Sequence, residues 1–115
     1  MPVTSRAAVL TGPGEVAITE ATVDDPAAHE VRVRIEACGL CRSDLHYVTG
    51  ELRTEFPMVP GHEAAGVVDA VGSSVTGFAP GDRVVTCMSV YCGTCDACRR
   101  GKTWLCQNRE RPPTQ

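Results

Sequence analysis

Hydrophobic and polar residues alternate along several short stretches of the chain, and this alternation predicts strands. The clearest case begins at Glu30, where every second residue from Val31 to Ala37 is apolar and the residues between them are charged. Two further runs, Arg6 to Leu10 and Val16 to Thr22, flank the turn residues of Thr11 to Gly14. Glycine and proline between two such runs predict an opening hairpin.

The second half of the chain adds two more apolar runs. Ala64 to Val71 lies between glycines and predicts a buried strand, and the β-branched run Arg83 to Thr86 predicts another. Cys41 to Tyr47 has room for one or two helical turns, and Gln107 to Gln115 is expected to be a tail or linker. Short strands with glycine turns and no long amphipathic helix predict a mainly β fold, a barrel or sandwich, with residues 1–115 as one domain.

Composition narrows the class of protein. The chain has 11 basic and 14 acidic residues, a formal net charge of -3 and no long basic run, so we do not expect nucleic acid as a partner. No apolar stretch approaches the length of a membrane span and the N-terminus does not resemble an export signal, so we expect no membrane association and a cytoplasmic location. An odd set of seven cysteines then favours reduced thiols used for metal binding or catalysis.

Four of these cysteines lie close together in the sequence. Cys92, Cys95, Cys98 and Cys106 are separated by two, two and seven residues. Four thiolates give a closed tetrahedral site that suits structural zinc, and the metal would supply the folding free energy of a lobe at about residues 92–106 that is too polar to form a core. An iron-sulfur cluster is the competing interpretation.

A second candidate metal site combines Cys41 with His62. One thiolate and one imidazole are typical partners in an open zinc site, where a third protein ligand and a water complete the tetrahedron. Each residue alone is weak evidence. His62 could instead be a satisfied core histidine, and Cys38 with Cys41 forms a C-x-x-C that is also found in redox pairs.

Taken together, these motifs resemble the zinc-containing alcohol dehydrogenases of the medium-chain dehydrogenase/reductase superfamily. The resemblance is carried by GLCRSDLH at 39–46, by GHEAAG at 61–66 continuing to Gly72 and Val75, and by the four-cysteine lobe, in the order and spacing of the family. It implies a GroES-like β-barrel with a short zinc-binding lobe. The implied activity is the interconversion of an alcohol and an aldehyde or ketone with NAD or NADP.

The resemblance also implies roles for individual residues around a catalytic zinc. Cys41 and His62 match its ligands, and Glu63 matches a residue that approaches or transiently binds the metal. Asp44 matches the carboxylate that orients the ligand histidine and fixes its tautomer. The full enzyme would then hold two zinc ions, one catalytic and one structural.

Three further residues match positions that handle protons and the cofactor. Ser43 and His46 match the proton relay, and Arg42 matches the cation that meets the cofactor pyrophosphate. Simpler interpretations remain open for the polar residues of this segment: Ser43 as a helix cap, Asp44 as a solvated charge and His46 as a surface histidine.

Some features of the complete family pattern have no counterpart in the sequence. The third cysteine ligand of the catalytic zinc and the nicotinamide-binding Rossmann domain are not found before Gln115. We therefore expect this chain to be inactive by itself, as part of a longer enzyme that forms a homo-oligomer. Cys38 and Cys87 have no implied role and are expected to be buried at strand ends. A stand-alone zinc-stabilised binding module is the alternative function.

Overall fold

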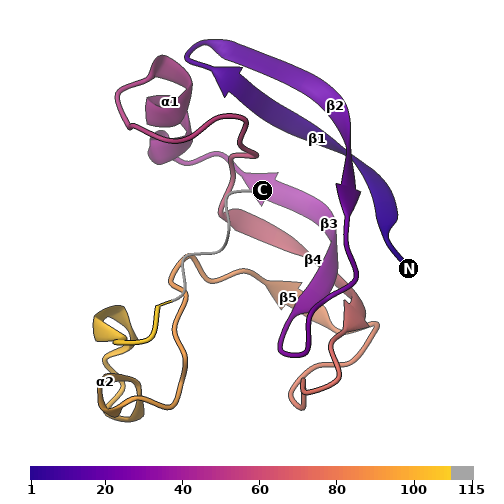
Figure 1. Ribbon diagram of the computed structural model, residues 1–115, viewed down its shortest axis with the longest axis vertical. Coiled ribbons are helices and arrows are strands. Elements are labelled where there is room, and N and C mark those ends of the chain that lie inside the picture. The colour runs from indigo at the N-terminus through magenta and orange to yellow at the C-terminus, as the bar shows by residue number, and fades with distance from the viewer. Residues whose placement is uncertain (110–115) are drawn as a thin grey trace.

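The computed structural model describes residues 1–109, and its first sheet is the predicted hairpin. Strands β1 (Val3–Gly12) and β2 (Glu15–Val23) pair antiparallel around the turn that contains Gly14 (Figure 1). Gly14 has a φ of 75°, a backbone conformation that side chains with a Cβ rarely adopt. The turn residues therefore set the position of the reversal, and pairing extends both strands beyond the apolar runs.

The second sheet has three antiparallel strands in the order β3 (Val31–Gly39), β4 (Glu63–Val71) and β5 (Arg83–Val85) (Figure 1). The predicted strands are confirmed, but β3 does not keep a simple two-residue period. Its pairing with β4 shifts between Arg32 and Val33 and again between Ile35 and Ala37. These irregularities disturb the alternation, and the side chain of Ile35 is 51% exposed.

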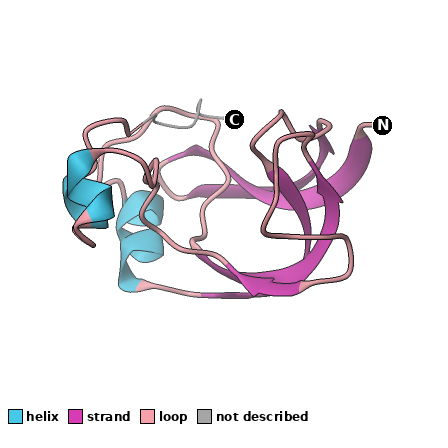
Figure 2. Ribbon diagram, turned by 90° about the horizontal axis from the view of Figure 1, so that it is seen from below, coloured by secondary structure: helices cyan, strands magenta, loops and turns pink. Residues whose placement is uncertain are grey.

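The remaining elements are short helices. Helix α1 (Arg42–Thr49) follows β3, and α2 (Asp96–Arg99) with the 3₁₀ turn η1 (Thr103–Leu105) forms a lobe that projects beside the second sheet (Figures 1 and 2). More residues lie in strands than in helices, so the prediction of a mainly β fold is confirmed. Leu10 and Val68 are fully buried and mark the core.

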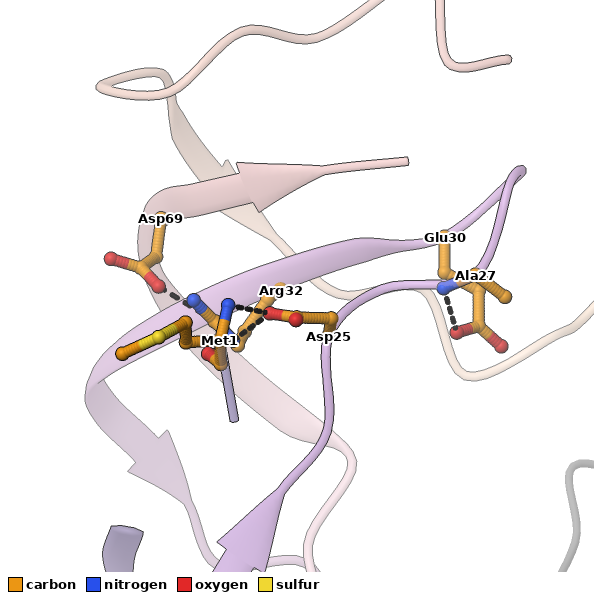
Figure 3. A network of polar contacts seen from close by, with 6 residues as sticks. All are labelled: Met1, Asp25, Ala27, Glu30, Arg32 and Asp69. Atoms are coloured by element: carbon orange, nitrogen blue, oxygen red, sulfur yellow. Dashed lines mark hydrogen bonds and ion pairs between the residues drawn. The ribbon is translucent and has the colours of Figure 1, made fainter. Parts of the chain in front are cut away.

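A polar network ties the N-terminus to the second sheet (Figure 3). Arg32 on β3 donates from Nε to Asp69 at 2.7 Å and from Nη1 to Asp25 at 3.2 Å. Asp25 also pairs with the amino group of Met1 at 2.6 Å. Since the Arg32 side chain is only 13% exposed, this network fixes the segment that joins the two sheets.

The sequence also predicts a C-terminal tail and no membrane-spanning segment. Residues 110–115 of the expected tail, Gln107 to Gln115, lie outside the described residues, so the extent of the single domain stays a prediction. Within residues 1–109, no helix is both long and apolar enough to cross a membrane.

Candidate metal centres

The first centre is built at the N-terminal end of α1. Cys41 is the N-cap residue of this helix, and its backbone N–H donates to Oδ2 of Asp44 at 2.8 Å. A carboxylate in the first helical turn satisfies an amide that has no partner within the helix and interacts favourably with the helix dipole. The spacing of Cys41 and Asp44 therefore fixes the Asp44 side chain beside the residue that carries the thiol.

The strand register brings two distant residues to the same place. In the β3–β4 pairing, Gly39 lies opposite Glu63, and His62 immediately precedes that strand. The ligand atoms of Cys41, His62 and Glu63 all lie within 4.8 Å of one another. A Cβ on Gly39 would collide with the Glu63 carboxylate, so glycine at this position leaves room for it. The three predicted donors thus form one cluster.

Asp44 connects the helix with His62. Its Oδ1 lies 3.7 Å from Nδ1 of His62, and this oxygen is buried without a hydrogen-bond partner among residues 1–109. A buried carboxylate oxygen facing an imidazole is the arrangement expected for a residue that orients a metal-ligating histidine. With Nδ1 turned to Asp44, Nε2 is the ring nitrogen left for a metal. The donor set therefore fits a zinc ion.

The thiol and the imidazole change each other's protonation. Hydrogen bonds from the side chain and backbone of Ser43, followed by the neighbouring His62, lower the pKa of Cys41. The hydrogen bond with Cys41 and the negative charge of Asp44 raise the pKa of His62. The first shift favours the thiolate, which is the form of cysteine that binds metals, and the second favours an imidazolium, which must lose its proton before it can bind a metal.

A cavity of about 560 Å³ opens over this cluster. Cys41, His62 and Glu63 form its polar end, and its remaining walls come from Ala64, Ala65, Val85, Thr86 and Met88. A concave site with mostly apolar walls and a few convergent polar groups is typical of small-molecule binding. The cavity therefore has room for an organic substrate beside the cluster.

The other predicted residues of this segment lie along α1. Ser43 is half-buried beside Cys41, and Arg42 is exposed at the first turn. His46 lies one turn further and its Nδ1 is 2.6 Å from Oε2 of Glu51. The structure thus brings Ser43 and Asp44 to Cys41, but shows no contact of Arg42 or His46 with the metal cluster among the described residues.

Sequence reasoning missed two residues in this region. Thr86 follows β5, and its hydroxyl accepts from Ala64 N at 3.1 Å and lies 3.2 Å from the carbonyl oxygen of His62. Glu51 contacts His46 as described above. Glycine is typical of a helix C-terminus, as at Gly50, but no sequence signal indicates which side chain the returning chain places against the helix.

The second centre is the four-cysteine lobe. The sulfur atoms of Cys92, Cys95, Cys98 and Cys106 lie within 4.8 Å of one another, and none of these residues forms a disulfide. Backbone amides point at the sulfurs: Cys95 N donates to Cys92 at 3.3 Å and Cys92 N donates to Cys106 at 3.3 Å. Four convergent sulfurs with amide donors fit a tetrahedral zinc.

The lobe cysteines differ in their affinity for protons. Hydrogen bonds from the side chain and backbone of Thr94 and from the Cys95 amide lower the pKa of Cys92 to about 5. Burial raises the pKa of Cys98 to about 12. A dication would favour the thiolate at every position, since metal ions bind the deprotonated form.

The remaining two cysteines differ from their prediction. Cys38 and Cys87 were expected to be buried, but both are exposed. Cys38 lies on β3 opposite Ala64, near the sheet edge at which Gly61 turns the chain. Both residues lie at or beyond a strand end, where few neighbouring residues cover the side chain.

Comparisons with known proteins agree with this geometry. The family described as "Alcohol dehydrogenase GroES-like domain" matches residues 27–112. A thermostable alcohol dehydrogenase from Pyrobaculum aerophilum, solved with cobalt and zinc bound, is 36% identical over 92% of this chain and 33% of its own, with a TM-score of 0.83. An alcohol dehydrogenase zinc-binding domain protein from Burkholderia ambifaria is 37% identical over 93% of this chain and 29% of its own, with a TM-score of 0.85.

A third solved structure carries a nicotinamide cofactor. CAD from Helicobacter pylori, complexed with NADP(H), is 29% identical over 93% of this chain and 32% of its own, with a TM-score of 0.77. The chain spans about a third of the length of these solved chains. The likeness therefore covers nearly all of this chain and a limited part of each relative.

Proposed function

The chain belongs to the alcohol dehydrogenase GroES-like domain family, and on that premise we propose that it is the zinc-carrying part of an oxidoreductase that interconverts an alcohol with an aldehyde or ketone using NAD or NADP. The mainly β, GroES-like fold expected from the sequence is confirmed by the family match and the similar structures. The observation that carries the proposed activity is the cluster of Cys41, His62 and Glu63 at the polar end of a cavity with apolar walls.

The residues of the cluster have separate tasks in this proposal. Cys41 and His62 hold the catalytic zinc, Glu63 approaches it from β4, and Asp44 orients His62 through the Nδ1 side of the ring. When bound, zinc supplies Lewis-acid polarisation of the alcohol or carbonyl oxygen, and the nicotinamide supplies or accepts the hydride. The apolar walls contact the carbon chain of the substrate.

The proton released by the alcohol needs a path away from the cavity. Ser43 lies beside Cys41 and accepts this proton, and His46, one helical turn further, passes it toward solvent. Arg42 remains exposed at the start of α1, where a permanent cation can meet the pyrophosphate of the cofactor. Helix α1 thus carries the proton and cofactor functions on the segment that Cys41 anchors.

The four-cysteine lobe has a structural task. Its zinc replaces a hydrophobic core, because Cys98 is the one buried apolar residue of the lobe within the described chain. A closed set of four thiolates leaves no position for a substrate, in contrast to the open cluster at Cys41. The two centres are therefore distinguishable by how firmly each retains metal.

Metal binding by the 115-residue chain tests the assignment of ligands. Cobalt is a suitable probe, since the Pyrobaculum aerophilum relative is described with cobalt and zinc bound. We expect one metal ion that resists chelation and a second, weakly held ion that Cys41→Ser removes while Cys87→Ser does not. If Cys41→Ser leaves the weak ion in place, the proposed catalytic site is wrong.

Turnover requires a nicotinamide-binding partner, which a chimera can provide. Replacing the matched third of the Pyrobaculum aerophilum enzyme by this chain should give alcohol-dependent reduction of the nicotinamide, lost in Cys41→Ser. A chimera that binds both metals but turns over no alcohol would contradict the proposed activity. Binding of a macromolecule by the lobe, without turnover, would instead favour the stand-alone module.

A further inference from the structure

The end of helix α1 returns the chain toward His46. Gly50 has a φ of 79° and its N–H donates to Tyr47 O at 3.2 Å, while Leu52 N donates to His46 O at 3.1 Å. This left-handed glycine cap reverses the chain and satisfies carbonyls that the helix leaves free. Glu51 lies between these two amides, so the reversal places its side chain beside the last turn of the helix.

The first hairpin supports the reversal from outside. Gly14 N, at the hairpin turn, donates to Val48 O at 2.6 Å. A Cβ at Gly50 would lie 3.2 Å from Cβ of Pro13, so the two segments pack closely. The hairpin turn and the glycine cap therefore fix the backbone on both sides of Glu51.

Both oxygens of the Glu51 carboxylate are used. Oε2 lies 2.6 Å from Nδ1 of His46, and Oε1 accepts from the Thr49 hydroxyl at 3.0 Å. Hydrogen bonds from Thr49 and then His46 lower the pKa of Glu51, so it is a carboxylate near neutral pH. An ionised carboxylate only accepts hydrogen bonds, and a short contact with it requires a hydrogen on the opposing nitrogen.

We propose that Glu51 is a positioning residue that holds His46 in the tautomer with hydrogen on Nδ1, so that Nε2 presents its lone pair to the proton relay. In this tautomer the proton leaves the Ser43 hydroxyl, whose O–H bond breaks, and forms a bond to Nε2 while the Nδ1–H bond is kept; the ring returns to the same tautomer when the Nε2 proton passes to water. The resulting imidazolium carries one positive charge opposite the carboxylate. The same contact thus selects the accepting nitrogen and stabilises the charged product.

The catalytic consequence rests on the proposed function, but the tautomer does not. Glu51 is 62% exposed, and an exposed ion pair by itself contributes little to stability. A surface pair without a positioning role would leave the tautomer unchanged when the carboxylate is removed. The tautomer is therefore the measurement that separates the two interpretations.

Nitrogen-15 NMR of the labelled 115-residue chain reads the tautomer directly. In the pH range where His46 is neutral, we expect a protonated-type shift for Nδ1 and an unprotonated-type shift for Nε2. Glu51→Ala should move both shifts toward the opposite tautomer, whereas Glu55→Ala, which removes a neighbouring exposed glutamate, should not. Thr49→Val, which keeps the carboxylate but removes one of its donors, should give a smaller change. The backbone amide spectrum verifies that each variant is folded.

The proposal is overturned if His46 carries hydrogen on Nε2 in the parent chain, or if folded Glu51→Ala leaves its ring shifts unchanged. In the chimera, Glu51→Ala should lower kcat/KM by about 10-fold or more, by analogy with the roughly 10- to 100-fold effect of carboxylates that orient metal-ligating histidines. It should have no further effect in a His46→Ala background. If the NMR result holds but the chimera is inactive in every form, the proposed function fails and the positioning of His46 stands.

Discussion

Asp44 faces His62 across the candidate catalytic site, with 3.7 Å between Oδ1 and Nδ1, while its other oxygen accepts the amide of Cys41 at 2.8 Å. One carboxylate therefore links the helix that carries the thiol to the strand that carries the imidazole. Its burial matters, because a buried carboxylate oxygen needs a partner to offset its desolvation.

Replacing Asp44 by Asn should weaken the metal at Cys41 and His62 without removing it. Asparagine keeps an oxygen for the Cys41 amide but loses the negative charge that favours Nδ1–H on His62. Partners of this kind contribute about 10- to 100-fold to metal affinity. Competition between the protein and a chelator for cobalt measures the change. Glu20→Gln, an equal loss of charge on exposed β2, is the control. Unchanged affinity in Asp44→Asn would show that Asp44 does not orient the ligand.

Zinc removal should loosen the four-cysteine lobe while leaving the sheets folded. Described contacts inside the lobe join α2 and η1, and its one buried cysteine is Cys98. Cys98→Ser should therefore lose the firmly held zinc and the protection of lobe amides against hydrogen exchange, while amides of β3 and β4 keep theirs. Cys87→Ser should retain both. Equal loss of protection throughout residues 1–109 would show that the lobe is not a separable unit.

Zinc binding at neutral pH should release at least one proton. The thiol of Cys98, with a pKa raised to about 12, is protonated in the metal-free chain, whereas Cys92, with a pKa lowered to about 5, is already a thiolate. Zinc requires the thiolate at both positions, so Cys98 must give up its proton and zinc affinity must fall as the pH falls. Calorimetry in buffers of different ionisation enthalpy counts the protons. A count of zero would mean that burial does not keep the Cys98 thiol protonated.

Thr86→Val should disturb the segment that carries His62 and Glu63. The hydroxyl contacts His62 O and Ala64 N, and the backbone N–H of Thr86 donates to Ala64 O at 2.9 Å. Valine keeps the shape and the backbone contact but loses the hydroxyl, at a cost of about 1 kcal/mol in unfolding free energy. Because His62 is displaced, the weakly held cobalt should change its absorption spectrum, while the four-cysteine site does not. Thr19→Val on β2 provides a control for the same substitution in a strand. Identical cobalt spectra in Thr86→Val and the parent would exclude this role.

The local parts of both sites could be predicted from the sequence. The cysteine spacing from Cys92 to Cys106 and the helical spacing of Cys41 and Asp44 place these residues together within short segments. Alternation in β3 and the apolar run of β4 likewise predict strands from nearest neighbours alone. Such predictions need no knowledge of how distant segments meet, which is why they hold.

Contacts between distant segments of the chain could not be predicted from the pattern of apolar and polar residues alone. The meeting of His62 with Cys41 follows from the register that pairs Gly39 with Glu63. Alternation assigns each residue to a face of the sheet, but it does not choose between registers that differ by two residues. The prediction that Cys41 and His62 bind the same metal came instead from the resemblance to the alcohol dehydrogenase family. Glu51 and Thr86 act through contacts that depend on side-chain direction at a chain reversal and a strand end, which single-sequence patterns do not predict.

The acid stability of the fold should depend on Asp25. Hydrogen bonding to the N-terminal ammonium, together with the charge of Arg32, lowers the pKa of this carboxyl below its ordinary value. A pKa that is lower in the folded than in the unfolded chain gives a stabilisation that is present above the unfolded value and is lost as the pH falls through the folded value. Asp25→Asn should therefore lower the midpoint of urea unfolding at about pH 7, and this effect should become smaller as the pH falls below about 4, the ordinary pKa of an aspartate carboxyl. Asp24→Asn, at the adjacent position, controls for the loss of one charge. An effect of Asp25→Asn that does not change as the pH falls would show that the network of Met1, Asp25 and Arg32 acts through packing and not through charge.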